Sequence, residues 1–350
     1  MITPMKHKFL VAPVLAAAVA AGLSSRGAGV ARAQSADLGV PGFHHLHLLS
    51  TNPDAAVAFY VAHFASATKA TWGGFPAVST PNNVLLLFTK VDRPPLTSPQ
   101  TAFWHFGWNV TDERAKLAEY ESKFPRDLAP LYTGDGDKFV HVSSDTWPGA
   151  AGTLGRTREQ IEEAKRDNVQ PAGGAGFGYL KGPDGVFIEF AGNQSQERFN
   201  HVHMFYDDPR CATLWYQEHL NVAPAGARGG GRGRGPAEPI TEANCKVEND
   251  YTRSWPALVP EGMVRTATGG GVFGDVTMTG YVRQSPTPLV STRGHSADHV
   301  GLSVKNLDAW LAKLRRENVT ILMEPYKLGD TRAAMIEGPS KAAIELVEVK

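Results

Sequence analysis

Two histidine pairs with the same spacing dominate the chemistry that this sequence could support. The first pair is His45 and His47, and the second is His201 and His203; each precedes an aromatic dipeptide by the same number of residues. Side chains at i and i+2 of a strand point to the same face. Because the imidazole ring is a common metal ligand, the repeat predicts a duplicated metal-binding cup on the face of a sheet.

Four segments of the chain share one pattern of expected elements. Each begins with an apolar strand that carries a histidine, and we expect these strands at 43–49, 102–110, 199–205 and 299–304. An amphipathic helix follows each strand, with N-caps expected at Thr51 or Asn52, at Thr111, at Asp208 and at Asn306. Short strands close each module, the last of them at 84–88, 186–190, 275–282 and 343–349. The chain therefore reads as four βαβββ modules.

The first strands of these modules alternate between two types. Modules one and three read His-x-His, whereas modules two and four read His-x-Gly, with His105 before Gly107 and His299 before Gly301. This alternation indicates that a two-module unit was duplicated. We therefore expect an α+β protein whose modules pair in chain order, with one domain at 40–195 (modules 40–95 and 100–195) and another at 197–350 (modules 197–285 and 295–350).

Carboxylates stand at matching places on two of the closing strands. Glu189 and Glu345 are each flanked by apolar residues, and a half-buried acid needs a partner or a metal. Each half of the chain thus offers two imidazoles and one carboxylate, which leave coordination positions open and suit Fe(II), Mn(II) or Zn(II). The expected first site is His45, His105 and Glu189, and a second site would be His201, His299 and Glu345.

Other residues near these ligands have two open interpretations. His47 and His203 could orient a ligand or act as a general base, or they could be hydrogen-bonded core residues. Tyr179 could orient a substrate oxygen or simply pack. The aromatic cluster Phe103, Trp104 and Trp108 is read as core in preference to a substrate platform.

The N-terminus is typical of a secretory signal peptide. Lys6, His7 and Lys8 precede an apolar run at 9–23, and the small residues Ala31 and Ala33 follow it. The alternative interpretation is a membrane anchor, but the apolar run is short for a segment that spans a membrane. We therefore expect cleavage after Ala33, residues 1–33 as the signal peptide, a periplasmic or secreted protein, and no membrane association after cleavage.

The composition excludes some classes of partner. Lys and Arg number 35, as do Asp and Glu, so no net charge favours nucleic acid or an anionic membrane. The Gly/Arg-rich stretch at 225–236 is read as a surface loop or lid in preference to an RNA-binding segment, and 157–167 as an inserted helix. Cys211 and Cys245 could form one disulfide in an exported chain, but the sequence leaves their pairing open.

With these modules and ligands in place, the chain resembles the vicinal oxygen chelate superfamily over residues 40–350. That superfamily includes glyoxalase I, fosfomycin resistance enzymes, bleomycin-binding proteins, methylmalonyl-CoA epimerase and extradiol dioxygenases. The resemblance implies glyoxalase-like domains, in which paired βαβββ modules form a curved mixed sheet around a divalent metal. The implied ligands lie on the first strand of each module and on the last strand, positions that match the two sets of His45, His105, Glu189 and His201, His299, Glu345.

Differences from the ligand patterns of individual members show which members of the superfamily this chain resembles more. Glyoxalase I needs a fourth ligand on the last strand of the odd module, where this chain has Leu87. The extradiol signature is matched by Tyr179, Pro183, Gly185 and Glu189, although Gly182 departs from it and the upstream histidine is missing. The fourth module has Met335 where Tyr179 would be, so the resemblance favours the first site.

The resemblance also leaves the composition of each cup open. Cups could form within each expected domain, or modules could be swapped so that His45 joins His299 and Glu345 while His201 joins His105 and Glu189. In either arrangement we expect an exported metal-dependent oxidoreductase, extradiol-dioxygenase-like, in which Tyr179 and His47 act on a small oxygenated substrate. The alternatives are a glyoxalase, epimerase or fosfomycin-type lyase or transferase, and a metal-free small-molecule-binding protein. We expect a small-molecule partner and a monomer or homodimer.

Overall fold

The computed structural model describes residues 38–129, 131–132, 139–140, 163, 166–167, 177–192, 194–223, 239–246, 268–283 and 286–350. The expected signal peptide at 1–33 and the Gly/Arg-rich segment at 225–236 lie outside these residues. The expected inserted helix at 157–167 also lies outside them, except for Glu163, Arg166 and Asp167.

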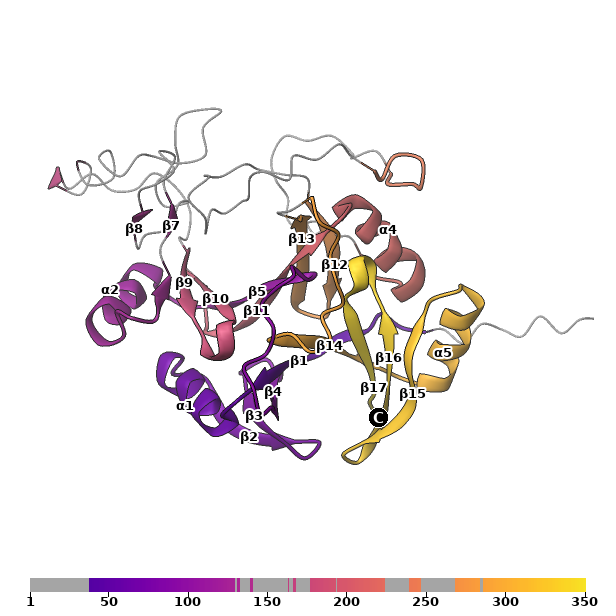
Figure 1. The fold of residues 1–350 in the computed structure, drawn as a ribbon, viewed down its shortest axis with the longest axis horizontal. Helices are drawn as coiled ribbons and strands as arrows, with labels where there is room; N and C mark the ends of the chain where they lie inside the picture. Colours follow the sequence, from indigo (N-terminus) through magenta and orange to yellow (C-terminus); the bar gives the residue numbers. More distant parts are fainter. Residues whose placement is uncertain are drawn as a thin grey trace, which may run out of the picture. The chain divides into compact units, whose positions relative to one another are not determined.

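The first sheet is built from both ends of the described chain. Its eight strands run in the order β15-β16-β17-β14-β1-β4-β3-β2, and β1 pairs with β14 in antiparallel fashion at its centre (Figure 1). The first module therefore shares a sheet with the fourth. The strands are β1 (Gly42–Ser50), β2 (Thr68–Trp72), β3 (Phe75–Ser79), β4 (Leu85–Lys90), β14 (Ala297–Val304), β15 (Ile321–Leu328), β16 (Thr331–Glu337) and β17 (Ala343–Glu348).

The second sheet joins the two middle modules in the same way. Its seven strands run in the order β12-β13-β11-β5-β10-β9-β6, with β11 antiparallel to β5 at its centre. The strands are β5 (Phe103–Asn109), β6 (Leu128–Ala129), β9 (Phe177–Lys181), β10 (Phe187–Ala191), β11 (Arg198–Tyr206), β12 (Thr268–Phe273) and β13 (Val276–Val282). A separate two-stranded sheet pairs β7 (Leu131–Tyr132) with β8 (Phe139–Val140).

These two curved mixed sheets confirm the expected α+β class and its glyoxalase-like architecture. They correct the expected pairing of the modules, because each sheet joins modules that are paired one with four and two with three instead of in chain order. The prediction followed chain order because modules two and four carry the same His-x-Gly signal, so nothing in the sequence distinguished the two possible partners of β1.

One helix follows the first strand of each module, close to where it was expected. The helices are α1 (Pro53–His63), α2 (Glu113–Lys123), α4 (Pro209–Leu220) and α5 (Leu307–Arg316). The side chain of Asn306, as predicted, and that of Asn52, one of the two predicted candidates, accept hydrogen bonds from the first turns of their helices. Asp208 is the N-cap of α4 but makes no such side-chain bond. The second helix is capped by Asp112, one residue after the predicted Thr111.

Strand alternation separates the core from the histidines. Leu46 and Leu48 of β1 are buried in a large apolar cluster that also contains Tyr60 of α1 and Trp310 of α5. His45 and its i+2 neighbour alternate with these leucines and therefore point to the opposite face of the sheet. Burial of the apolar face against helices thus fixes the register that presents the imidazoles on the other face.

The two sheets share part of this apolar cluster. Phe43 of β1 stacks on Phe199 of β11 at a centroid distance of 5.3 Å, and Phe106 of β5 stacks on the same ring at 5.4 Å. Asn82, which precedes β4, donates to the carbonyl oxygen of Phe199 at 2.9 Å. These contacts connect the first strands of three modules in one core.

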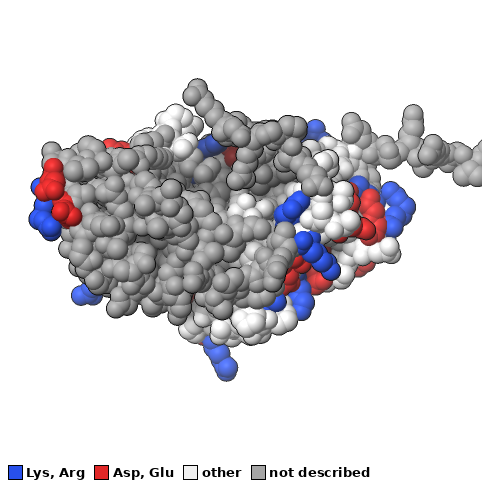
Figure 2. All heavy atoms as spheres, turned by 90° about the horizontal axis from the view of Figure 1, so that it is seen from above, with Lys and Arg blue, Asp and Glu red and all other residues white. Residues whose placement is uncertain are grey.

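Charged side chains are mixed on the described surface. On the part of the face in Figure 2 that is not grey, Lys and Arg alternate with Asp and Glu, in keeping with the equal totals of the two signs. Among the described residues, no helix has both the length and the apolar character that crossing a membrane requires.

Cys211 of α4 and Cys245 form a disulfide, which resolves the pairing that the sequence left open. The bond closes a loop between residues 34 positions apart. Because such a crosslink restricts the unfolded chain, we expect replacement of both cysteines by serine to lower the free energy of unfolding by about 2–4 kcal/mol. Urea unfolding of the double variant and of the oxidised parent measures the difference; coincident unfolding curves would contradict the prediction.

Candidate metal centres

The structure gathers the predicted ligands into two groups. We call the group of His45, His299 and Glu345 cup A, with His47 at its rim. We call the group of His105, Glu189 and His201 cup B, with His203 at its rim. The imidazoles of each cup, together with Glu189 in cup B, meet the spacing expected of groups that could hold a metal ion.

The register of the first sheet positions cup A. His45 of β1 pairs with Gly301 of β14, and Glu345 of β17 pairs with the same glycine from the other side, so both side chains share one face. His45 Nε2 lies 3.5 Å from His299 Nε2 and 3.4 Å from Glu345 Oε2. His299 Nε2 lies 3.8 Å from Glu345 Oε1. Three strands thus bring two imidazoles and one carboxylate to a single point.

The second sheet repeats this register in cup B. His201 of β11 pairs with Gly107 of β5, and Glu189 of β10 pairs with that glycine from the other side. Glu189 Oε2 lies 3.1 Å from His105 Nε2 and 3.7 Å from His201 Nε2. The two cups are therefore built by the same pairing of an odd module with an even one.

A glycine under each odd-module histidine makes this approach possible. A Cβ on Gly301 would lie 2.0 Å from His45 Cε1, and a Cβ on Gly107 would lie 2.0 Å from His201 Cε1. Each imidazole therefore occupies the space directly over a glycine of the neighbouring strand. The His-x-Gly motif is a consequence of this contact, in which the glycine accommodates the partner module's ligand.

The buried polar atoms of both cups fit a metal ion. Among the described residues, His201 Nε2 in cup B and Glu345 Oε2 in cup A are buried without a hydrogen-bond partner, although such atoms are normally paired. Metal bonds of about 2.1 Å place neighbouring ligand atoms about 3.0–3.4 Å apart. The spacing of 3.1–3.7 Å around Glu189 Oε2 is close to that, so these donors fit a divalent cation.

The electrostatic environment keeps these groups in the forms that bind metal. Burial lowers the pKa of His105 to about 4 and the pKa of His45 well below its usual value, so both rings are neutral near pH 7. Burial alone would raise the pKa of Glu189, but His201 and His105 beside it hold that pKa well below its usual value. Neutral imidazoles and an ionised carboxylate are the required ligand forms.

The arrangement corrects the expected first and second sites. His45 does not join His105 and Glu189, and His201 does not join His299 and Glu345. The swapped alternative is the one that forms, because the modules pair one with four and two with three. The two residues expected to act together are also separated, since Tyr179 contacts Glu189 in cup B and His47 lies in cup A.

The second histidine of each pair lies at the rim of its cup. His47 Nε2 is 2.7 Å from Thr89 Oγ1, and burial lowers the pKa of His47 to about 3. His203 Nδ1 lies 2.9 Å from His105 Nε2 and 3.9 Å from Glu189 Oε2. The His47 ring also lies 4.5 Å from the His299 ring, so both rim histidines pack against ligands of their cups.

Two supporting residues of cup A escaped the sequence analysis. The hydroxyl of Tyr326 donates to Glu345 Oε1, although the residue at the Tyr179 position of this module is Met335. Tyr326 lies on β15 beyond an irregularity in pairing, so no motif spacing indicates it. Asp298 accepts a hydrogen bond from His299 Nδ1 at 2.6 Å; its place beside His299 in an apolar strand was an available signal.

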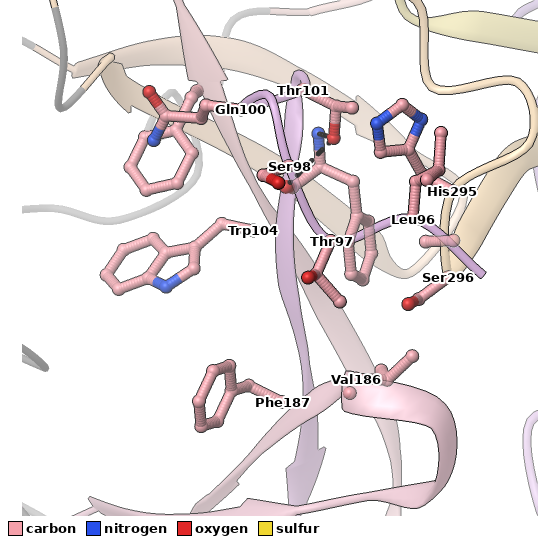
Figure 3. Close-up of a pocket in the computed structure, with 14 residues that line it drawn as sticks. Leu96, Thr97, Ser98, Gln100, Thr101, Trp104, Val186, Phe187, His295 and Ser296 are labelled. Carbon is pink, nitrogen blue, oxygen red and sulfur yellow. Dashed lines mark hydrogen bonds between the residues drawn. The ribbon is translucent and has the colours of Figure 1, made fainter. Parts of the chain in front are cut away.

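A cavity of about 410 Å³ has Trp104 and Phe187 in its lining, and none of the ligands of cup B lines it. Trp104 and Phe187 extend to the same side from β5 and β10 (Figure 3), and the Trp104 ring lies 4.3 Å from the His105 ring. Trp108 stacks on Phe64 in the core at 4.4 Å, which confirms the core interpretation for that residue. Trp104 is also buried, in a second apolar cluster with Phe205 and Leu289, and in addition it lines the cavity. The remaining lining residues are Leu96, Thr97, Ser98, Gln100, Thr101, Phe103, Gly185, Val186, Phe205, His295, Ser296 and Ala297.

Comparisons with known proteins agree with this architecture. Residues 198–346 match the model of the Glyoxalase/Bleomycin resistance protein/Dioxygenase superfamily. Glyoxalase I from Zea mays is similar over 88% of this chain and 92% of its own, with 14% identity and a TM-score of 0.52. A single-substitution variant of that enzyme gives the same coverage, with 13% identity and a TM-score of 0.53. No curated sequence matches significantly.

The similarity to the solved structures concerns the fold and extends over 88% of this chain. The family-model match, in addition, is a similarity in sequence, and it covers modules three and four. Together with the two His/Glu cups, the family-model match over residues 198–346 and the shared fold support the resemblance to the vicinal oxygen chelate superfamily.

Proposed function

We propose that the protein is an exported, metal-dependent enzyme that acts on a small oxygenated substrate at cup B, with dioxygenase-like chemistry. The observation that carries this proposal is the convergence of His105, His201 and Glu189. Trp104, which packs against His105, connects them to the neighbouring cavity. The cavity has the size of a small-molecule site. Two imidazoles and one carboxylate are the ligand set of Fe(II) oxygenases with open positions.

A metal held by these three residues would supply a Lewis acid for two neighbouring oxygens of the substrate and for the negative charge that develops on them. The protein's own groups prepare that chemistry. Tyr179 donates to Glu189 Oε2 at 3.1 Å and so orients the carboxylate. Trp104 and Phe187 provide apolar walls that would hold the body of the substrate and exclude water.

His203 takes in cup B the place that His47 takes in cup A. Burial lowers the pKa of His203 well below its usual value, so its ring is neutral near pH 7. We therefore assign to His203 the general-base role that the sequence analysis gave to His47. Its Nδ1 atom lies 2.9 Å from His105 Nε2, which places it beside the reaction centre.

The ligand set favours this chemistry over the glyoxalase-type alternative. Leu87, which pairs with His47, and Thr279, which pairs with His203, stand on the last strands of the odd modules. Neither can supply a carboxylate to complete a closed four-ligand set. The experiment must distinguish this proposal from two alternatives. One is an isomerase, epimerase or lyase that uses Mn(II) or Zn(II), and the other is a metal-free binding protein.

The test begins with anaerobic loading of the purified protein with Fe(II), Mn(II) or Zn(II) in separate samples. Each sample is then assayed for oxygen uptake with a panel of catechols and for isomerisation of a hemithioacetal. We expect oxygen uptake and ring opening with Fe(II) alone. Turnover of the hemithioacetal without oxygen uptake would favour the isomerase, and absence of any metal binding would overturn the enzyme proposal.

The export part of the proposal has its own measurement. If residues 1–33 are removed on secretion, the mature protein in the periplasmic or external fraction begins at Gln34. N-terminal sequencing of that fraction checks this, and an intact N-terminus in the cytoplasmic fraction would contradict it.

Truncation of Trp104 should weaken substrate binding more than turnover. The indole lines the cavity and packs against the His105 ring, but it offers no ligand atom to the cup. Trp104→Ala should therefore raise KM by about tenfold, the loss of about 1.4 kcal/mol of aromatic packing, while kcat changes less. Steady-state kinetics measure both constants. Trp215→Ala on helix α4, away from the cavity lining, is the control, and an equal change in KM there would contradict the assignment.

A further inference from the structure

The two cups differ in how their histidines are held. In cup A, His299 Nδ1 donates to Asp298 Oδ1 at 2.6 Å, and Asp298 is itself held by Arg293 Nη1 at 2.6 Å and by the backbone NH of Gly294 at 2.7 Å. This chain fixes the tautomer of His299 with its Nε2 lone pair directed to His45 and Glu345. A carboxylate behind a ligand histidine raises the ring's basicity and holds its orientation.

The carboxylate of cup A is fixed in a similar way. Tyr326 donates to Glu345 Oε1, which leaves Glu345 Oε2 as the buried oxygen without a hydrogen bond among the described residues. The side chain is only 4% exposed. That unpaired oxygen lies 3.4 Å from His45 Nε2 and faces into the cup.

Cup B lacks the corresponding anion behind its histidines. The residue before His105 is Trp104, and His105 Nδ1 is buried without a hydrogen-bond partner in the described part of the chain. His201 Nδ1 meets only the neutral amide of Asn200, at 3.1 Å. A ring without a charged acceptor is a weaker metal ligand than one backed by a carboxylate.

Cup A is placed in the sheet so that a metal bound there would stabilise the fold. Its ligands come from β1 in the first module and from β14 and β17 in the last, and His45 is 254 residues from His299 in sequence. A metal bound there would crosslink the two ends of the described chain at the centre of the eight-stranded sheet. Closing so long a loop stabilises the folded state, because the unfolded chain loses the corresponding freedom.

We propose that cup A is a tight, structural site for a divalent cation of the Zn²⁺ class, backed by Asp298, and that cup B is the weaker, exchangeable site. This inference rests on the proposed function only in assigning the reaction to cup B. The ligands of cup A, His45, His299 and Glu345, are imidazole and carboxylate groups that Zn²⁺ accepts, so the difference between the cups lies in the groups behind the ligands.

The experiment is a Zn²⁺ titration of the metal-free full chain against a chromophoric chelator. We expect two classes of site, the tighter of which raises the melting temperature. Asp298→Asn keeps the size and the hydrogen-bond acceptor but removes the charge, and should weaken the tight class by about 10–100-fold. Asn200→Ala, the matched control behind His201, should weaken only the other class.

Circular dichroism of each metal-free variant shows whether it is folded. If the Asp298→Asn variant is unfolded, Tyr326→Phe serves as the second probe of cup A. Two sites of equal affinity, or a tight constant that Asp298→Asn and Tyr326→Phe leave unchanged, would overturn the inference. Loss of the tight class in Asn200→Ala would also overturn it. Failure of the proposed function appears instead as absence of turnover, which leaves the titration and melting results intact.

Discussion

Replacing Glu189 by glutamine should lower kcat by at least about 10²–10³-fold, whereas the same replacement at Glu345 should leave kcat close to that of the parent. Glutamine keeps the shape of the side chain and removes its charge. Glu189 Oε2 lies 3.1 Å from His105 Nε2 and accepts from Tyr179. Loss of the charge removes the anionic ligand of cup B, next to the cavity in which we place the substrate.

Elemental analysis of the same variants shows which cup has lost its metal. The parent should hold about two equivalents, and each variant about one. Glu345→Gln should show the larger fall in melting temperature, since cup A crosslinks the first and last modules. Full metal content in Glu189→Gln, or an equal loss of kcat in Glu345→Gln, would contradict the assignment of the reaction to cup B.

The local elements of this chain were predictable because their signals are local. Asn52 and Asn306 could be recognised as N-caps from the strand and helix patterns on either side. The second cap moved from Thr111 to Asp112, since both residues are competent caps and the helix begins one residue later. The alternation that places His45 with His47, and His201 with His203, on one face of each strand was likewise predictable from a period of two.

The partners of the ligands were not predictable, because the pairing of the modules is a long-range choice between similar residues. His45 meets a His-x-Gly strand in either arrangement, and the two even modules differ little at that motif. The identities of His105 and His299 as ligands could be predicted, but not which of them faces His45. The glycine of each His-x-Gly motif could have been interpreted as space for a histidine ring from a neighbouring strand. That interpretation would still not have shown which odd module supplies the ring.

Supporting residues were the hardest to predict because they reach the cups from irregular positions. Tyr179 lies on the register of Glu189 and was identified from its motif spacing. Tyr326 performs the same contact for Glu345 from a different strand, beyond a pairing irregularity. The presence of Met335 at the motif position therefore does not mean that cup A lacks a phenol, and the preference for a site near Tyr179 now depends on the cavity.

Replacing Gly301 by alanine should remove the metal from cup A and lower the free energy of unfolding by about 1–3 kcal/mol or more. The new Cβ would lie 2.0 Å from His45 Cε1 and 2.1 Å from His45 Nδ1. His45 is fully buried on a strand paired on both sides, so its ring cannot move without displacing β1. Gly107→Ala is the counterpart in cup B and should displace His201 in the same way.

A double-mutant cycle separates this steric cause from a general effect of alanine in a strand. In a His45→Ala background the ring is absent, so Gly301→Ala should then destabilise much less than it does in the parent. Gly39→Ala, in the segment before β1, is the control for a substitution without steric conflict, because a Cβ there meets nothing within 4 Å. Chemical unfolding of the four proteins of the cycle measures the coupling. Additive effects of the two substitutions would mean that the glycine does not accommodate the imidazole, and the physical account of the His-x-Gly motif would fail.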